Sequence, residues 1–401
     1  METTTTEKIP EVKDDRGSLS ELLVAVRRHL HQNPEIGFKE YKTSDYIRSV
    51  LESNGLTVSQ SVAGTGLFVD IEGSAPGPIV AYRADIDALP IQDHKSVSYR
   101  SKVDGLAHLC GHDAHTSIAI GVALLVSKTR DRFKGTVRVF FQPNEEGVPS
   151  GAPEMIRAGV LDNVEAVYAI HVDPTLPVGS FGLIRGAATA AADRFQVTVK
   201  APSSGHSARP HQTVDTVWIA TQIAQAYYQL SGRVTDARNP SILTICKFDG
   251  GSAFNVIPET VSFGGTLRCT NGADRSFLKE RIVAIGEAFG KMHKTTVDVE
   301  YFDGAPPVIN DATLIDRSAV VVRKLFGDAA VVDIPVPSMG AEDFAYYLEK
   351  VEGAMIRVGT SSSPETSYAL HDANFDIDEE ALLPASQLMS GILINHLKSI
   401  S

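Results

Sequence analysis

The sequence is poor in cysteine and contains no disulfide-rich pattern. Its three cysteines, Cys110, Cys246 and Cys269, are an odd and sparse set in 401 residues, which argues against a disulfide framework. Cys246 and Cys269 lie in apolar strand-like runs, so we expect both to be buried as small hydrophobic residues. Cys110 differs from them because it lies among histidines and carboxylates.

The sequence also has a deficit of positive charge and no long apolar run. Lysine and arginine total 37 against 49 acidic residues, a formal net charge of −12, which argues against a nucleic-acid partner or an anionic membrane surface. No apolar run approaches the ~18 residues that a membrane span needs. Residues 1–15 are polar and threonine-rich, without the apolar core of a signal peptide. We therefore expect a cytoplasmic protein without a membrane partner.

Helical and strand-like runs alternate through the first half of the chain, which predicts a doubly wound α/β catalytic domain. The length of 401 residues favours two domains over one. The expected strands cover residues 66–71, 79–83, 136–142 and 166–171, and the expected helices cover 22–31, 44–54 and 116–127.

From Asp193 the order of elements changes to β-α-β-β-α-β, which predicts a ferredoxin-like α+β domain. Its expected strands are 194–201, 242–248, 260–269 and 296–302, with helices over 214–230 and from Phe277 to Met292. The α/β signals then resume, with helices over 312–326 and 382–399 and strands near 331–334 and 354–358. We therefore expect residues 193–303 to be an inserted domain, with 1–192 and 304–401 forming the catalytic domain.

The segment from His108 to His115 reads His-Leu-Cys-Gly-His-Asp-Ala-His and brings a thiol and imidazoles together. Cys110 and His112 can present their side chains to one side of an extended or sharply turned segment. A helix expected from Thr116 places them on a strand-to-helix loop, where open α/β sheets bind ligands. Thiolate and imidazole are transition-metal ligands, although a buried cysteine beside a surface histidine is the simpler interpretation.

Two adjacent carboxylates strengthen the metal hypothesis. Glu145 and Glu146 follow an apolar strand-like run, and neighbouring carboxylates repel unless a cation is present or one is protonated. His171 also ends a strand-like run, and His371 comes from a late loop. Each feature alone fits a solvated acidic turn or a structural histidine. Together they predict a metal-dependent hydrolase, in which one carboxylate binds metal and the other moves a proton.

These residues resemble the M20 metallopeptidase family, and most of all its amidohydrolase branch of aminoacylase-like, hippurate-hydrolase-like and auxin-conjugate-hydrolase-like enzymes. The similarity extends from about residue 20 to residue 399. It rests on the segments 28–35, 82–90, 110–116, 142–146, 205–206, 255–258, 265–268, 340–344 and 370–371.

The resemblance implies two divalent metal ions per chain, Zn or Mn, with Co or Ni also compatible. Cys110 would bridge the ions, and His112, Glu146, His171 and His371 would complete the ligands. Other branches carry a histidine ligand where this chain has Arg83, whose guanidinium has no acceptor atom. Asp85 is then expected to orient a ligand imidazole.

The resemblance also implies the reaction, which is hydrolysis of an N-acyl-L-amino acid or of a short peptide with a free C-terminal carboxylate. Glu145 would act as general base and then general acid on a metal-activated water. His206 would donate to the oxyanion, from the partner subunit of a homodimer formed through the inserted lid domain. Asn255 and Arg268 would anchor the substrate carboxylate.

Two alternatives stay open at this point. In a thiol hydrolase, Cys110 would be the nucleophile and His112 its base, so activity would survive chelation and be lost on alkylation. In a retired enzyme, the same residues would form a metal-binding module that does not turn over substrate.

Overall fold

The computed structural model describes residues 16–400, so the expectation for residues 1–15 lies outside it. These residues form two compact units. The first contains the described residues through Gly186, Asn310–Pro335 and the residues from Tyr346 onward, and the second contains Ala187–Ile309 and Val336–Ala345. Residues 336–345 thus group with the second unit, and the domain boundaries proposed at 192/193 and 303/304 stay predictions.

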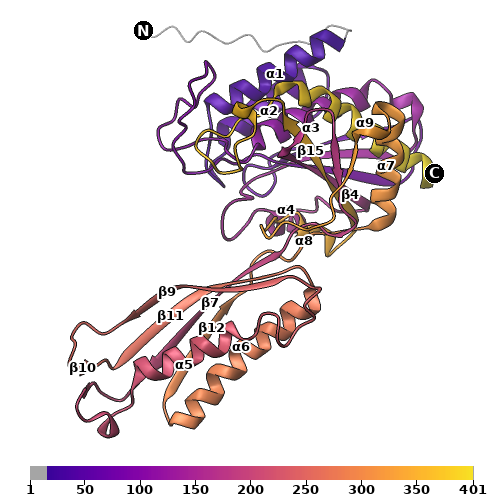
Figure 1. Ribbon diagram of the computed structural model, residues 1–401. Coiled ribbons are helices and arrows are strands. Elements are labelled where there is room, and N and C mark those ends of the chain that lie inside the picture. Colours follow the sequence, from indigo (N-terminus) through magenta and orange to yellow (C-terminus); the bar gives the residue numbers. More distant parts are fainter. Residues whose placement is uncertain (1–15, 401) are drawn as a thin grey trace, which may run out of the picture. The chain divides into compact units, whose positions relative to one another are not determined.

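The first unit is built on a seven-stranded sheet in the order β1-β3-β2-β4-β15-β5-β14 (Figure 1). Its strands are β1 (Leu67–Glu72), β2 (Ile79–Asp85), β3 (Thr136–Gln142), β4 (Val164–Pro177), β5 (Phe181–Leu183), β14 (Val331–Asp333) and β15 (Glu352–Ser361). The neighbouring strands β3, β2, β4 and β15 run parallel, whereas β1 and β5 run antiparallel to their neighbours β3 and β15. This mostly parallel sheet confirms the predicted α/β class.

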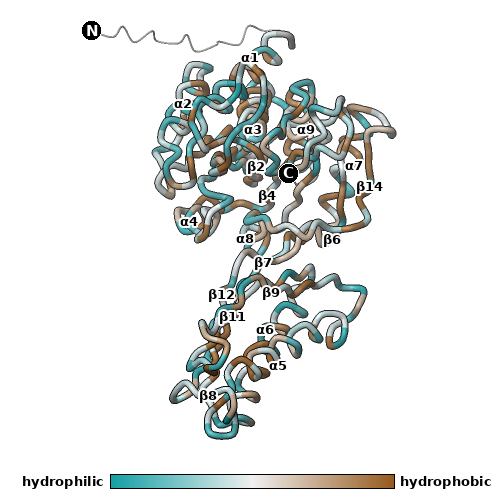
Figure 2. Tube along the Cα trace, turned by 60° about the vertical axis from the view of Figure 1, so that its left-hand side comes forward, coloured by the Kyte–Doolittle hydropathy of each residue, from teal (hydrophilic) through white to brown (hydrophobic). Residues whose placement is uncertain are grey.

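Helices pack against the sheet of the first unit and bury its strands. They are α1 (Arg16–Gln32), α2 (Tyr41–Ser53), α3 (His112–Ser127), α4 (Ala152–Arg157), α7 (Ala312–Phe326) and α9 (Leu382–Ile400). Six of the seven residues of β2 and of β3 are buried, as in parallel strands covered on both faces. Helix α3 is buried nearly all round and packs against α1, α9 and β2, so it is a central element of this unit (Figure 2).

The second unit is a four-stranded antiparallel sheet with two helices (Figure 1). Its elements are β7 (Ala191–Lys200), α5 (Thr216–Tyr228), β9 (Ser241–Gly250), β11 (Thr260–Cys269), α6 (Gly272–His293) and β12 (Thr296–Phe302), with the short pair β8 (Gly205–His206) and β10 (Val256–Ile257). The sheet order β12-β7-β11-β9 with the chain order β-α-β-β-α-β confirms the predicted ferredoxin-like arrangement. Alternate residues of β7 are buried in a core shared with α5 and α6.

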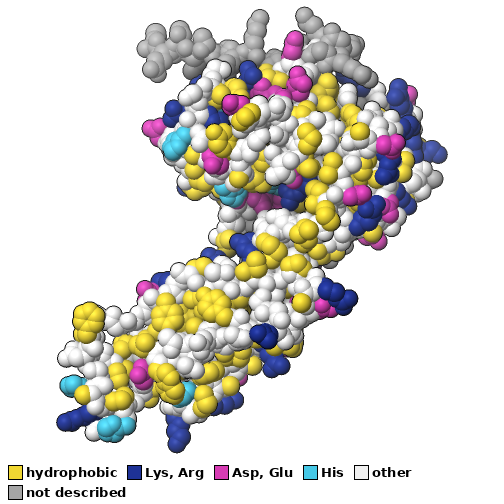
Figure 3. All heavy atoms as spheres, in the orientation of Figure 1, with side chains coloured by type: hydrophobic (Ala, Val, Ile, Leu, Met, Phe, Trp, Pro, Cys, Tyr) yellow, Lys and Arg dark blue, Asp and Glu magenta, His cyan; other side chains and the backbone are white. Residues whose placement is uncertain are grey.

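Strand β9 is an edge of this sheet, and hydrophobic side chains are exposed on and near it. Ile242 and Phe248 of β9 and Phe254 in the following segment are exposed, and Figure 3 shows hydrophobic side chains gathered on the surface of this unit. Cys246 is also exposed, so the prediction that it is buried is wrong, whereas Cys269 is buried as expected. An edge strand that is not covered on both faces leaves alternate side chains in solvent, which the apolar run did not reveal.

No helix among residues 16–400 is both long enough and apolar enough to cross a membrane.

Candidate metal centre and active site

Three parallel strands bring the predicted site segments to one edge of the first sheet. Strand β2 lies between β3 and β4, and residues Asp85 and Gln142 end β2 and β3 in register. The chain therefore leaves both strands at the same edge, with Glu145 and Glu146 in the loop after β3. His171 lies inside β4, which continues to Pro177, so the prediction that the strand ends at His171 is wrong.

The segment that carries Cys110 and His112 makes a tight turn into α3. Gly111 precedes the helix with φ of 86°, and a Cβ atom built on it would lie 2.3 Å from Val172 Cγ2 of β4. Both the left-handed backbone and the close approach therefore require glycine. Helix α3 begins at His112 rather than at the predicted Thr116, so His112 belongs to the first turn of the helix and not to a loop.

The structure brings all five predicted metal ligands together. The ligand atoms of Cys110, His112 and Glu146 lie within 4.8 Å of one another. Cys110 Sγ is 3.6 Å from His171 Nε2, and His371 Nε2 is 3.1 Å from Glu146 Oε1. The backbone N–H of His371 donates to the carbonyl of Leu109 at 2.7 Å, which holds this late loop beside Cys110.

The hydrogen bonds of two histidines leave the correct nitrogen for a metal. His112 Nδ1 lies 2.9 Å from the carbonyl oxygen of Asp87, and His171 Nδ1 lies 2.8 Å from that of Val172. A carbonyl only accepts, so each Nδ1 carries the proton and each Nε2 presents a lone pair. His112 Nε2 is buried and has no hydrogen-bond partner among the described residues. Soft thiolate, two such imidazoles and a carboxylate fit a pair of divalent transition-metal ions.

The charge around these residues also favours a cation. Burial opposes a charge on His112, but the charge of Asp85, the hydrogen bond to Asp87 and the nearby Cys110 thiol raise the pKa of the imidazole well above its ordinary value. Burial raises the pKa of the Cys110 thiol to about 12, even though His112 opposes that shift. A metal ion competes with these protons and makes the thiolate a ligand, whereas without one the thiol is a poor nucleophile at neutral pH.

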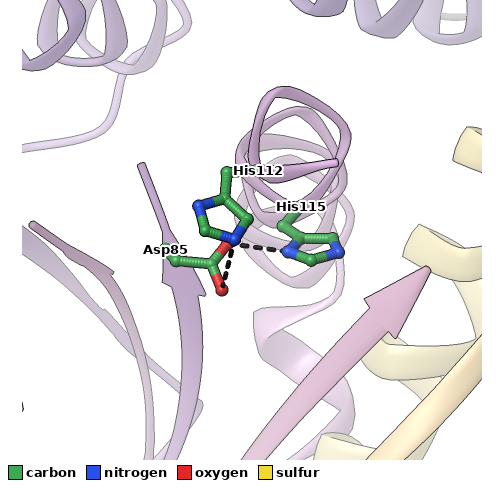
Figure 4. Close-up of side chains that lie close together, drawn as sticks. All are labelled: Asp85, His112 and His115. Carbon is green, nitrogen blue, oxygen red and sulfur yellow. Dashed lines mark hydrogen bonds and ion pairs between the residues drawn. The ribbon is translucent and has the colours of Figure 1, made fainter. Parts of the chain in front are cut away.

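Asp85 lies in a second cluster with His112 and His115, both from α3 (Figure 4). His115 Nδ1 is 2.7 Å from Asp85 Oδ1, and His115 Nε2 accepts the backbone N–H of Val172 at 3.0 Å. Both nitrogens of His115 are therefore in use, and it is not a ligand in this arrangement. Asp85 Oδ2 accepts from Arg83 at 2.6 Å and lies 3.8 Å from His112 Nε2, and its orienting role stays a prediction.

Asp87 was not among the predicted site residues, although its Oδ1 lies 3.2 Å from His112 Nδ1. Two signals were available: Asp87 lies two residues after the end of β2, and it belongs to segment 82–90, on which the family resemblance rests.

The predicted base and the predicted substrate-binding residues lie in different units. Glu145 is half-buried in the first unit, with Oε2 4.0 Å from His112 Nε2. In the second unit, His206 of β8 pairs with Val256 of β10, and the carbonyl of Asn255 accepts the N–H of Ser207 at 3.1 Å, so His206 and Asn255 are neighbours. Arg268 of β11 is half-buried and donates to the carbonyl of Met339 at 3.0 Å.

A mostly parallel α/β unit, an antiparallel α+β unit and a thiolate–imidazole–carboxylate cluster define a metal-dependent hydrolase. Residues 81–395 match the model of peptidase family M20/M25/M40, and the chain belongs to this family. The N-acetyl-L-cysteine deacetylase of Bacillus subtilis (strain 168) is 38% identical over 93% of this chain and 87% of its own length. The IAA-amino acid hydrolase ILR1-like 2 of Arabidopsis thaliana is 35% identical over 98% and 87%.

A solved structure carries the same architecture. The YXEP protein of Bacillus subtilis, described as a dinuclear metal-binding peptidase of the M20 family, superposes with a TM-score of 0.86 at 32% identity. The alignment covers 96% of this chain and all of that one. This chain is therefore a hydrolase of the M20 dinuclear-metal type, and its fold is that of the M20 catalytic and lid domains.

Proposed function

We propose that this protein hydrolyses the amide bond of N-acyl-L-amino acids, or of short peptides with a free C-terminal carboxylate. The observation that carries the proposal is the convergence of Cys110, His112, Glu146, His171 and His371, with both buried imidazoles presenting Nε2 to the thiol and carboxylate. Relatives that act on an N-acetyl amino acid and on an indoleacetyl amino acid support this substrate class.

The residues of the first unit have distinct roles in this proposal. Cys110, His112, Glu146, His171 and His371 would hold two divalent ions, Zn or Mn, with Co or Ni also compatible. When bound, the ions polarise the scissile carbonyl and lower the pKa of a shared water. Glu145 takes a proton from that water and then gives it to the leaving amine. Asp85 orients the imidazoles of His112 and His115, which both belong to α3.

The residues of the second unit act on the substrate. His206 donates a hydrogen bond to the oxygen that develops negative charge in the transition state. Arg268 and Asn255 bind the free α-carboxylate, for which a guanidinium fork is well suited. A free carboxylate is common to N-acyl amino acids and peptides, so these residues select the substrate class and not the acyl group.

Metal removal and thiol alkylation together test the proposal. Because exposed Cys246 would also react with the alkylating agent, it is first replaced. In a Cys246→Ser background, dialysis against a chelator should abolish turnover, and Zn, Mn or Co should restore it. Alkylation of the metal-loaded protein should have little effect because Cys110 is buried and bound. Activity that survives exhaustive chelation but is lost on alkylation would instead support a thiol hydrolase with Cys110 as nucleophile.

The substrate panel for this assay consists of acetyl-, benzoyl- and indoleacetyl-amino acids together with dipeptides. Turnover of any of them by the metal-loaded protein supports the proposed reaction, and the ranking identifies the preferred acyl group. A protein that binds two metal ions but cleaves none of the panel would be a retired enzyme that keeps only the metal site.

We further propose that the protein is a homodimer formed through the second unit, with His206 acting on the partner's metal site. Among the described residues β9 is an edge strand of its sheet, and this edge and the exposed side chains of Ile242, Phe248 and Phe254 support this surface. Glu145 and His206 also belong to different compact units of the chain, so that two chains can each supply one of them.

Mixing two inactive variants tests the shared site. A Glu145→Gln chain combined with a His206→Ala chain leaves one intact site in each heterodimer if His206 acts in trans. We expect the mixture to recover up to about half of the wild-type activity per heterodimer, because one of two sites is complete. Activity is measured after co-expression with two affinity tags, and no recovery in the purified heterodimer would mean that His206 acts in cis.

A further inference from the structure

Arg357 is a half-buried arginine beside the proposed metal site. It lies on β15, directly opposite His171 of the neighbouring parallel strand β4 (Figure 1). Side chains that are in register on two paired strands point to the same face of the sheet, so Arg357 and His171 share one face. Burial lowers the pKa of His171 well below its ordinary value, and the positive charge of nearby Arg357 acts in the same direction.

Arg357 has no counter-ion within the part of the chain that the structure describes. No carboxylate among residues 16–400 forms an ion pair with its guanidinium. Asp173 lies two positions after His171 on β4, but its Oδ1 accepts the backbone N–H and the hydroxyl of Thr175, at 2.9 and 2.6 Å. A half-buried charge without a partner costs free energy, so an anion from outside the chain is favoured at this position.

Apolar neighbours restrict the Arg357 side chain on the side away from His171. Gly182 of β5 lies opposite Arg357. A Cβ atom built on Gly182 would lie 2.4 Å from Ile334 Cδ1 and 3.0 Å from both Leu176 Cδ1 and Arg357 Cβ. The base of the Arg357 side chain therefore shares a crowded apolar environment with Leu176 and Ile334. This packing limits the directions in which the guanidinium can point.

The proposed metal site adds positive charge near Arg357. Of its five ligands, only the Cys110 thiolate and Glu146 carry negative charge, against two divalent ions. The carboxylate of Asp85 is already paired with Arg83 at 2.6 Å. A further anion is therefore attracted to this end of β15, and a guanidinium can bind a carboxylate with two parallel hydrogen bonds.

We propose that Arg357 binds a second carboxylate of the substrate, so that the protein prefers N-acyl amino acids with a carboxylate in the acyl group or in the amino-acid side chain. This inference rests on the proposed function, in which Arg268 and Asn255 bind the α-carboxylate and leave Arg357 for another anion. In this role Arg357 determines specificity and contacts neither the scissile bond nor the water that attacks it.

Substrate pairs that differ by one carboxylate test the proposal. N-acetylglutamate and N-acetylglutamine test the side chain, whereas N-succinylalanine and N-succinamoylalanine test the acyl group. In one pair, we expect kcat/KM of the wild type for the acidic member to exceed that for its amide partner by at least about 10-fold, because the acidic member forms charge-assisted hydrogen bonds. The pair that shows this preference identifies which part of the substrate carries the second carboxylate.

Arg357→Met removes the guanidinium and keeps an apolar side chain of similar length. We expect this variant to lower the ratio of kcat/KM between acidic member and amide partner by roughly 10- to 100-fold, mainly through KM. Arg357→Lys should keep part of the preference, because an ammonium keeps the charge but not the planar fork. Arg185→Met is the matched control, since Arg185 is exposed in the same unit and pairs with Asp316 and Asp333, so its loss should leave the ratio unchanged.

Calorimetric titration provides a second readout that does not depend on turnover. In a Glu145→Gln background loaded with Zn, the intact acidic substrate should bind more tightly than its amide partner. Adding Arg357→Met should reduce this difference in Kd by a factor similar to that seen in the kinetics.

The outcomes separate this inference from the proposed function. If the metal-loaded wild type turns over none of these substrates and none of the earlier panel, the proposed function fails, and the titration decides whether Arg357 binds a carboxylate. If neither acidic substrate is preferred over its amide, or if Arg357→Met keeps the preference in kinetics and titration, Arg357 does not bind the substrate and the inference is overturned.

Discussion

Replacing Glu145 with glutamine should lower kcat by roughly 10²- to 10⁴-fold while the protein keeps its full metal content. Glutamine has almost the same shape but cannot take a proton from water at neutral pH. Glu145 lies close to the predicted ligands, with Oε2 4.0 Å from His112 Nε2, yet it is Glu146 that belongs to the cluster with Cys110 and His112. The two neighbouring carboxylates should therefore respond differently to the same substitution.

The measurement combines steady-state kinetics with metal analysis of the purified variant. Glu146→Gln is the informative comparison, because it should lose metal as well as activity. Glu154→Gln is the control, since that residue lies in α4 and pairs with exposed Arg157. Near-native turnover by Glu145→Gln would contradict the proposed mechanism.

Replacing Arg27 with methionine should lower the free energy of unfolding of the first unit by about 3–5 kcal/mol. Arg27 is fully buried, and its guanidinium contacts Asp113 at 2.8 Å, Asp376 at 2.5 Å and Glu379 at 3.2 Å. Methionine fills the space of the aliphatic stem but leaves three carboxylates without their shared cation. Urea denaturation followed by a probe in the first unit measures the change.

Arg28→Met is a matched control in the next position of the same helix. The Arg28 side chain is 45% exposed and, among the described residues, forms an ion pair with Glu379 alone, so its loss should cost at most about 1 kcal/mol. Both guanidiniums lie over the ring of Tyr99, at 4.9 and 4.7 Å, so the control also accounts for that contact. Equal effects of the two substitutions would refute the importance of the buried network.

The destabilisation by Arg27→Met should also depend on pH. Burial raises the pKa of Asp113, but Arg27 and His31 outweigh burial and hold it well below its ordinary value. A lowered carboxyl pKa stabilises the folded state above the unfolded pKa of about 3.9, and this contribution is lost as the pH falls through the folded value. The difference in the free energy of unfolding between the wild type and Arg27→Met should therefore become smaller below about pH 4.

Helices and strands were predicted well where the local sequence pattern and the tertiary contacts favour the same structure. Residues 136–142, 260–269, 296–302 and 312–326 were predicted with the bounds that the structure has. Apolar or alternating runs between glycine, proline or asparagine turns are sufficient for such elements. The start of α3 was missed because His112, Asp113 and His115 are polar yet buried, so tertiary contacts decide where that helix begins.

For the site, prediction from the sequence was limited by contacts between residues that are far apart in the chain. The ligand candidates were predicted by residue type and resemblance, but apart from Asp85 the residues that contact them were not. Arg27 lies 86 residues from Asp113 and 349 from Asp376, and nothing in the local pattern of α1 distinguishes it from Arg28. Asp87 was likewise overlooked, because its contacts with His112 and with the backbone of Glu146 form only in the folded chain.

The accessibility of the three thiols makes this chain convenient for site-specific labelling. Cys246 is exposed on edge strand β9, whereas Cys110 and Cys269 are buried. A maleimide fluorophore or spin label therefore attaches to the second unit without any engineered cysteine. Because Cys246 lies on the surface proposed to join two chains, dimer formation should slow its modification, so the rate of labelling reports whether that surface is covered.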